Sequence, residues 1–270
     1  MRRNPKISVI TVVLNAARDL EKTLESTIGQ DYPGLEIIII DGGSVDGTLA
    51  VIKRFANRIN YWISEPDGGI YDAMNKGLAR ATGDWVNFMN AGDVFYNKRV
   101  LSSVFSRDHG DAGVIYGDSI ASYPGFRAFR KAGTPADLWK GMICCHQSVF
   151  VRTKLVRHDG FRHNQYFSAD YEMMVRLQSA GVMFSYIPAT VSVFDTRGIS
   201  NRYMARSARS NLEIIGVYRV LTEGEKSCHR RIIRIAQITE MLYKCLPAAV
   251  TRLLLRQLYR NQVINKEIRR

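Results

Sequence analysis

Apolar and polar residues alternate in blocks between residues 6 and 89, and the blocks predict an α/β sheet. Four short runs rich in β-branched residues are each separated by a segment whose apolar positions recur every three or four residues. Nearly continuous apolar runs are typical of parallel strands buried on both faces, and their alternation with helices predicts a doubly wound, mostly parallel sheet. The predicted strands are 6–14, 35–41, 59–64 and 85–89, and the predicted helices are 19–30, 47–55 and 70–81.

The pattern becomes less regular after residue 95. Apolar positions three or four residues apart predict a helix over 170–180. Residues 120–145 and 155–168 have no pattern that predicts an element, so the parts of a ligand site that they form cannot be read from them. Three shorter apolar runs predict strands at 114–118, 148–152 and 183–187.

The last part of the chain differs from the rest in pattern and in charge. Residues 1–195 carry 22 basic and 20 acidic side chains, whereas residues 196–270 carry 16 basic and 5 acidic ones. The formal net charge of +13 therefore comes mainly from the C-terminal part, which indicates an anionic partner. Because helical spacing also dominates there, we expect an α/β domain over 1–200 and a helical, basic region over 201–270.

Composition excludes several classes of protein. Of 270 residues, 46% are hydrophobic and 23% are charged, which allows a core and excludes wholesale disorder. No apolar run approaches the roughly 20 residues that span a bilayer, and the N-terminus lacks a signal-peptide pattern, so we expect a cytoplasmic protein. The four cysteines form neither a disulfide framework nor a zinc spacing. Neither the dinucleotide fingerprint nor a P-loop is present in the sequence.

Polar residues gather where the predicted strands end. Asn15 follows the first strand, Asp41 ends the second and Asp67 follows the third, while Asn90 and Asp93 come after the fourth. In an open α/β sheet these points line one crevice, and their carboxylates and amides suit a ligand with hydroxyls and phosphates. Asp41 precedes two glycines, and its carboxylate either accepts a hydrogen bond from uracil or guanine or caps the following turn.

Six motifs occur in order along the chain, among them the stretch from Asp41 to Thr48 and the stretch from Glu65 to Gly77. Together they resemble the motifs of family 2 glycosyltransferases, whose single nucleotide-binding domain is called GT-A. The Gly-Ile-Tyr-Asp-Ala-Met-Asn-Lys-Gly stretch is highly specific, and it resembles bacterial exopolysaccharide, O-antigen and glycolipid enzymes, including colanic acid transferases. The resemblance implies a GT-A catalytic domain and inverting transfer of a sugar from a UDP- or GDP-sugar to a lipid-linked saccharide or glycolipid. The six segments are 8–15, 41–48, 65–77, 88–93, 145–150 and 169–172.

The resemblance also implies which residues bind the donor. Asp41 would hold the nucleobase, and Asp67 would lie near the nucleotide or the sugar, although Asp67 can also cap the helix that begins near residue 70. Tyr71 and Met74 are expected to be packing residues. The implied donor-binding residues are Leu14, Asn15, Asp41, Asp67, Asn75 and Asn90.

Asn90-Ala91-Gly92-Asp93 matches the metal-binding motif of the family, but two of its carboxylates are missing. Asp93 is therefore the metal ligand that the resemblance implies, and a site of oxygen ligands suits Mg²⁺ or Mn²⁺. Such an ion would neutralise the charge that develops on the leaving diphosphate. With one protein carboxylate, the ion would be held mainly by the diphosphate and water, so we expect weak affinity without donor.

Asp170 matches the catalytic base of the family, with Ala169 before it. A base there would take the proton of the acceptor hydroxyl as its oxygen attacks the anomeric carbon, and a single displacement inverts that carbon. A helix N-terminus would keep the carboxylate ionised, although Asp170 could also serve only to start the helix. His146 and Arg197 are candidates for contact with the acceptor or the diphosphate, and the alternatives are a core histidine and a surface arginine.

The C-terminal region predicts a basic amphipathic surface. A helix over 227–246 ends at Pro247, and a second helix follows it. Basic side chains beside apolar ones suit an anionic membrane, so we expect a protein peripheral to the inner face of the cytoplasmic membrane. The alternative is a helix pair packed on the catalytic domain. The second helix places Arg252, Arg256 and Arg260 beside Val250, Leu254 and Leu258.

Two other functions remain as alternatives. A nucleotidyltransferase would need a glycine-rich loop with basic residues near the N-terminus, and residues 11–19 lack one. A nucleic-acid-binding protein would fit the net charge, but the basic and aromatic residues form no recognisable RNA or DNA module. We therefore expect no nucleic-acid partner.

Overall fold

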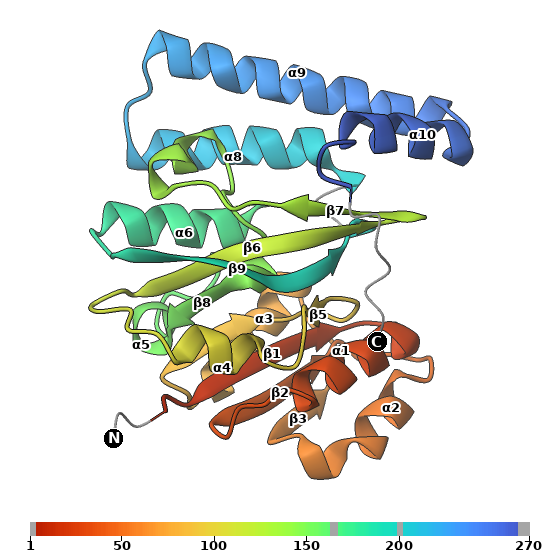
Figure 1. Ribbon diagram of the computed structural model, residues 1–270, viewed down its shortest axis with the longest axis vertical. Helices are drawn as coiled ribbons and strands as arrows, with labels where there is room; N and C mark the ends of the chain where they lie inside the picture. Colours follow the sequence, from red (N-terminus) through yellow and green to blue (C-terminus); the bar gives the residue numbers. More distant parts are fainter. Residues whose placement is uncertain (1–3, 163–166, 199–201, 264–270) are drawn as a thin grey trace.

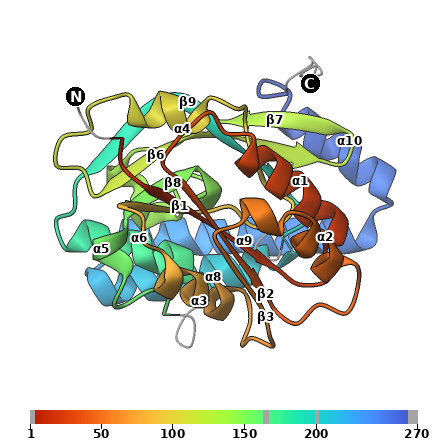
Figure 2. The same ribbon diagram turned by 90° about the horizontal axis from the view of Figure 1, so that it is seen from below.

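The computed structural model describes residues 4–162, 167–198 and 202–263. These residues form one mixed sheet covered by helices on both faces, with a helical layer beyond one face (Figures 1 and 2). The predicted doubly wound α/β sheet is confirmed, and its strand order is β3-β2-β1-β4-β8-β6-β9-β5 with β7 paired to β6. The strands are β1 (Ile7–Val13), β2 (Leu35–Asp41), β3 (Tyr61–Ser64), β4 (Trp85–Phe88), β5 (Val94–Phe95), β6 (Val114–Tyr123), β7 (Phe126–Arg130), β8 (Val149–Arg152) and β9 (Phe184–Asp195).

The four predicted strands form the parallel part of the sheet. β1 pairs with β2 and β4, and β2 pairs with β3, all in parallel. Ile38 and Ile40 of β2 pack toward α3, whereas Ile37 and Ile39 pack toward α1 and α2. Because both faces are covered, both need apolar side chains, which explains the nearly continuous apolar run. The helices of this half are α1 (Ala17–Ile28), α2 (Thr48–Arg54), the short η1 (Ala56–Arg58) and α3 (Ile70–Arg80).

The other half of the sheet is largely antiparallel. β8 runs antiparallel to β4 and β6, β5 runs antiparallel to β9, and β6 with β7 forms a hairpin whose turn places Gly125 at φ 89°. β6 and β9 extend beyond the strands predicted at 114–118 and 183–187. The hairpin strand β7 has arginines at two of its five positions and buries only Ala128, so it carries no buried-strand pattern. The remaining elements of this half are α4 (Val100–Phe105), η2 (Pro135–Lys140), η3 (His146–Ser148), α5 (Thr153–Val156) and α6 (Ala169–Ser179).

The C-terminal residues form a helical layer on the α6 side of the sheet (Figure 1). Ile214 and Ile215 of α8 join the core cluster that includes α6, and α9 packs on α8. α9 begins at Glu223, earlier than predicted, because Thr222 caps it in a capping box with Glu225. The boundary expected at residue 200 lies outside the described residues. The layer consists of α8 (Met204–Tyr218), α9 (Glu223–Cys245) and α10 (Ala248–Leu258).

None of the helices over the described residues combines the length and the hydrophobicity that a membrane crossing requires.

Candidate functional site

The carboxyl ends of the parallel strands lie level with one another. Val13 pairs with Asp41 and Asp41 pairs with Ser64, so β1, β2 and β3 end at one edge of the sheet. The Ala91 N–H donates to the Val12 carbonyl, which brings the turn after β4 to the same edge. The structure thus places the loops of the candidate donor residues side by side.

Asp41 is buried and holds the loop that follows it. Its Oδ2 accepts hydrogen bonds from the Ser44 N–H at 3.1 Å and from the Ser64 hydroxyl, and its Oδ1 accepts from the Ser44 hydroxyl. Asn15 has a left-handed backbone (φ 50°), and its N–H donates to Ser44 Oγ at 2.7 Å. Leu14 is 57% exposed beside Gly42 and presents an apolar surface at this edge. The loops after β1 and β2 are therefore fixed to each other around Asp41.

Asp67 and Asn75 belong to the segment around α3. Asp67 Oδ1 accepts a hydrogen bond from the Gly69 N–H at 2.8 Å, but Gly69 is itself the N-cap of α3 and no side chain caps this helix, so the capping alternative is wrong. A Cβ at Gly42 would lie 2.5 Å from Asp67 Oδ2, so a side chain at that position would displace the Asp67 carboxylate. The Asn75 amide donates to the Phe161 carbonyl at 2.9 Å and accepts from the Phe161 N–H at 2.8 Å. Asn75 thus anchors the loop before α6, and its contact with a donor stays a prediction.

The turn after β4 contains the candidate metal ligand. Asp93 is 6% exposed, and its carboxylate accepts hydrogen bonds from the Asp195 N–H at 2.9 Å and from the Gln147 amide. Burial raises the pKa of Asp93 to about 6 despite these donors and the nearby His146. Over the described residues, no group of three His, Cys, Asp or Glu side chains could hold a metal ion by itself.

One oxygen at this turn lacks a partner. Asn90 Oδ1 is buried and accepts no hydrogen bond from any described residue. A carboxylate oxygen and an amide oxygen are both ligands for a hard cation. Asn90 and Asp93 therefore fit a cation that receives most of its ligands from another molecule.

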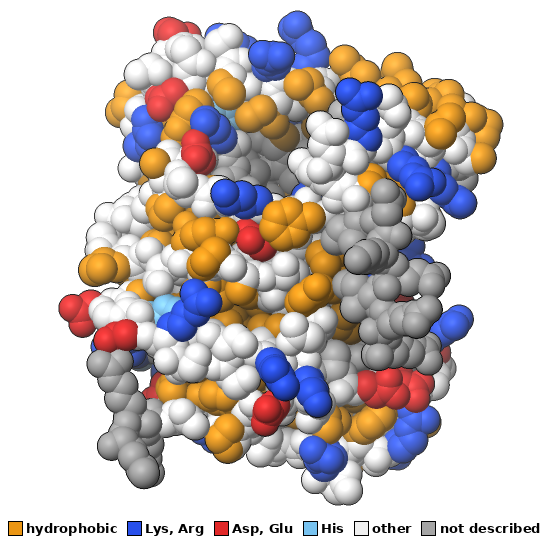
Figure 3. Space-filling view, viewed as in Figure 1, with side chains coloured by type: hydrophobic (Ala, Val, Ile, Leu, Met, Phe, Trp, Pro, Cys, Tyr) orange, Lys and Arg blue, Asp and Glu red, His pale blue; other side chains and the backbone are white. Residues whose placement is uncertain are grey.

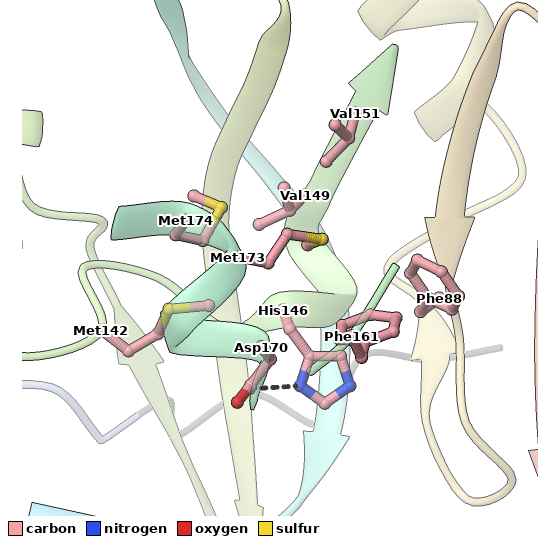
Figure 4. Close-up of a pocket in the computed structure, with 9 residues that line it drawn as sticks. All are labelled: Phe88, Met142, His146, Val149, Val151, Phe161, Asp170, Met173 and Met174. Carbon is pink, nitrogen blue, oxygen red and sulfur yellow. Dashed lines mark ion pairs between the residues drawn. The ribbon is translucent and has the colours of Figure 1, made fainter. Parts of the chain in front are cut away.

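Asp170 lies in the first turn of α6 and faces two side chains from other elements. The Tyr71 hydroxyl donates to Asp170 Oδ1 at 2.8 Å, and His146 Nδ1 lies 3.5 Å from Asp170 Oδ2. Figure 4 shows the histidine and the carboxylate facing each other at a pocket. The pocket is otherwise lined by Phe88, Met142, Val149, Val151, Phe161, Met173 and Met174.

Because the pocket is otherwise apolar, the polar side chains beside Asp170 decide whether its carboxylate is charged. Burial in these surroundings raises the pKa of Asp170, but the bonds from His146 and Tyr71 outweigh it, and the net pKa is lowered. Asp170 is therefore ionised at neutral pH and can accept a proton.

Arg197 is exposed and lies beside the turn after β4. Its guanidinium pairs with Asp195 at 2.5 Å and lies 3.9 Å from Asp19. Because the Asp195 N–H donates to Asp93, Arg197 is close to the candidate metal turn. The position is compatible with contact to a diphosphate as well as with a surface ion pair.

Sequence reasoning missed several polar contacts at this site. Tyr71 was expected only to pack, yet its hydroxyl reaches Asp170. Gln147 holds Asp93, and Ser64 holds Asp41. Tyr71 and Gln147 stand inside recognisable motifs, so the motifs were the signal that could have identified them.

The sequence of the chain is similar to those of known proteins. The profile described as Glycosyl transferase family 2 matches residues 8–175. A "PGL/p-HBAD biosynthesis glycosyltransferase" of Mycobacterium bovis is 32% identical over 205 residues, which are 73% of this chain and 80% of that protein.

Two solved structures share the fold. The mannosyltransferase PcManGT from Pyrobaculum calidifontis, in complex with GDP-Man and Mn²⁺, has a TM-score of 0.64 at 17% identity, and the match covers 95% of this chain and 80% of that one. TarS of S. aureus in complex with UDP has a TM-score of 0.60 at 19% identity, over 84% of this chain and 69% of that one. At such identities the likeness is evidence of the fold alone.

Proposed function

The chain belongs to glycosyl transferase family 2, and from that premise we propose that it transfers a sugar from a UDP- or GDP-sugar to a hydroxyl of a lipid-linked saccharide or glycolipid. The fold is GT-A and the protein is a glycosyltransferase. The observation that carries the proposal is the position of the Asp170 carboxylate, which faces Tyr71 and lies across His146 from the edge where the donor loops meet.

In the proposed reaction, Asp170 accepts the proton of the acceptor hydroxyl. The freed oxygen forms a bond to the anomeric carbon, the bond from that carbon to the diphosphate breaks, and the electron pair leaves with the diphosphate. A single displacement of this kind inverts the anomeric configuration. General-base help of this type contributes roughly 10²- to 10⁴-fold in rate.

The donor side of the proposal rests on the loops after β1 and β2. The Asp41 carboxylate can accept a hydrogen bond from an N–H of uracil or guanine while Ser44 and Ser64 hold it in place. The two structural neighbours were solved with UDP and with GDP-Man, which supports a nucleotide-sugar donor for this chain. The proposed donor contacts are Leu14, Asn15, Asp41, Asp67, Asn75 and Asn90.

A divalent cation, Mg²⁺ or Mn²⁺, belongs to the same proposal. Asp93 and Asn90 would hold it together with the donor, and the bound ion would neutralise charge on the leaving diphosphate. Mn²⁺ in the PcManGT complex supports this assignment. Arg197 would add a positive charge beside the same turn.

The C-terminal layer supports a membrane-bound acceptor. Figure 3 shows hydrophobic side chains gathered over α10 and the adjoining end of α9, with Lys and Arg side chains beside them. Arg252, Arg256 and Arg260 are all exposed, and Arg252 lies beside the turn at Gly125. We infer peripheral attachment to the inner face of the cytoplasmic membrane, because this surface combines apolar area with positive charge. The exposed apolar residues are Ile235, Ile238, Met241, Leu242, Tyr243, Val250, Leu253 and Leu254.

A thermal-shift screen of UDP-, GDP- and dTDP-sugars, with Mn²⁺ and with EDTA, tests the donor proposal. A ligand that binds only the folded state at a hundred times its Kd stabilises it by about 2.7 kcal/mol, so a matching sugar nucleotide should raise the Tm by several degrees.

The variant Asp93→Ala separates the role of the cation from that of the donor loops. This variant should lose most of the additional increase in Tm that Mn²⁺ gives to the donor complex. It should keep the increase in Tm that the donor gives in EDTA. Equal losses in both conditions would assign Asp93 a structural role. Absence of any shift and of any transfer with all three donor classes would refute the proposed function.

A further inference from the structure

Tyr71 carries a hydroxyl that the packing of its ring does not require. The ring stacks on Phe161 with centroids 5.4 Å apart and planes at 28°. A phenylalanine would make the same contact. The hydroxyl donates to Asp170 Oδ1 at 2.8 Å and so links α3 to the first turn of α6.

His146 approaches the other oxygen of the same carboxylate from η3. Its Nδ1 lies 3.5 Å from Asp170 Oδ2, and its Nε2 lies 3.1 Å from the Asn90 amide nitrogen. An amide nitrogen can only donate, so Nε2 is the acceptor and the proton of the neutral ring is on Nδ1, facing Asp170. The carboxylate thus faces an O–H on one side and an N–H on the other.

We propose that Tyr71 and His146 are positioning residues that hold the Asp170 carboxylate in one orientation, Tyr71 at Oδ1 and His146 at Oδ2, so that it is aligned to receive the acceptor proton. The catalytic consequence rests on the proposed function, whereas the effect on the carboxylate itself does not. The Asn90 amide contacts the His146 ring and so links that ring to the turn after β4.

The surroundings of Asp170 make these two donors decisive. Among the residues that the structure describes, the titratable groups that face it are Tyr71 from α3, His146 from η3, and the thiols of Cys144 and Cys145 from the segment before η3. Burial raises the pKa of both thiols, so they stay neutral. Burial and the neighbouring carboxylate also raise the pKa of Tyr71 well above its usual value, so its hydroxyl remains a donor.

The direct test is a carboxyl NMR titration of the full chain labelled at aspartate carbons, with Asp170→Asn identifying the signal. Tyr71→Phe keeps the ring and removes the donor, so the pKa of Asp170 should rise. Tyr186→Phe is the matched control, because its hydroxyl donates to Asp118 at 3.0 Å, away from Asp170. An unchanged Asp170 titration in Tyr71→Phe would overturn the proposal.

His146 is tested with a pair of variants. His146→Asn retains an N–H close to the position of Nδ1, whereas His146→Leu removes it. The leucine variant should raise the pKa of Asp170, and the asparagine variant should restore much of the difference. Equal pKa values of Asp170 in the two variants would contradict the role proposed for His146.

The kinetic readout separates positioning from general destabilisation. In Tyr71→Phe the acidic limb of the profile of kcat against pH should move to higher pH. At pH values below that limb, kcat should fall about tenfold, because hydrogen bonds to charged groups are among the stronger ones. The KM for donor should not change. If the NMR shift occurs while the wild-type protein transfers no sugar from any donor, the proposed function fails and the positioning role stands. A uniform loss of kcat at all pH values, without an NMR shift, would show that Tyr71 only packs.

Discussion

Most apolar residues of the parallel half of the sheet are buried, whereas many of those in the C-terminal helical layer are exposed. In β1 and β2, apolar residues from Ile7 to Val13 and from Ile37 to Ile40 are buried. Among the described residues of α9, only His229 is buried, and Leu253 of α10 is 68% exposed. A periodic apolar face predicts that something covers it, but the covering surface can be another element or a molecule outside the chain.

Charged side chains of the two regions also differ in how far they are buried. Buried carboxylates in the sheet are held by several donors each, as Asp41 is by Ser44 and Ser64. Arg256 and Arg260 of the helical layer face solvent. The sheet therefore uses its charges inside the fold, whereas the helical layer exposes them.

The largest expected effect concerns the carboxylate of Asp170 in the first turn of α6. Asp170→Asn should lower the rate of sugar transfer by roughly 10²- to 10⁴-fold, because an amide cannot accept the acceptor proton. Donor affinity measured by calorimetry should stay close to the wild-type value. Asp31→Asn, the same change at an exposed turn, is the control. Turnover near the wild-type rate in Asp170→Asn would exclude Asp170 as the base.

A second test addresses a buried charge in the sheet that has no part in the reaction. Glu36 is buried and accepts hydrogen bonds from Lys6 at 2.7 Å, Ser8 at 2.5 Å and the Thr82 N–H at 2.8 Å. Burial alone would raise its pKa, but these donors outweigh burial and lower the pKa to about 2. Because the folded-state pKa lies below the unfolded value, the resulting stabilisation is present above about pH 4.5 and is lost as pH falls toward 2.

The stabilisation by ionised Glu36 amounts to about 3 kcal/mol at most. Glu36→Gln should therefore lower the free energy of unfolding in urea at pH 7, and the difference from wild type should shrink as pH approaches 2. Glu25→Gln on the exposed face of α1 should behave like wild type at every pH. A difference that does not depend on pH would mean that Glu36 contributes through packing only.

The smallest expected effect concerns the helical layer. Each basic residue near an anionic leaflet contributes about 1 kcal/mol, so Arg256→Glu with Arg260→Glu should weaken binding to phosphatidylglycerol vesicles by about thirtyfold or more. High salt should release part of the wild-type protein. Lys53→Glu with Arg58→Glu, near the end of α2, reverses two exposed charges elsewhere and serves as the control.

A matching change tests the apolar part of this surface. Leu253→Ser with Leu254→Ser should also reduce co-sedimentation with vesicles. If wild type dimerises and ignores vesicles at low salt, a second copy of the chain covers the surface instead of a membrane. Equal co-sedimentation of wild type and the charge-reversal variant would show that the arginines only solvate a helix pair.

The sequence by itself determined the parallel half of the fold and the candidate base. Strands buried on both faces leave a continuous apolar run, so β1, β2 and β4 were predictable from local pattern, and the half-buried β3 was predicted with them. Asp170 was identified from a motif, and so were the candidate donor residues. β5 and β7 escaped prediction because β5 is two residues long and β7 is a partly exposed edge strand, so partners rather than local pattern define them.

Only the tertiary structure decided what surrounds the base. Tyr71 and Asp170 are 99 residues apart, and Asn90 and His146 are 56 apart, yet they form one chain of contacts. No local pattern encodes such pairings, because they depend on how α3, η3 and α6 pack around the end of β4. The same holds for the helical layer, where periodicity showed which residues share a face but only packing decided that this face remains exposed.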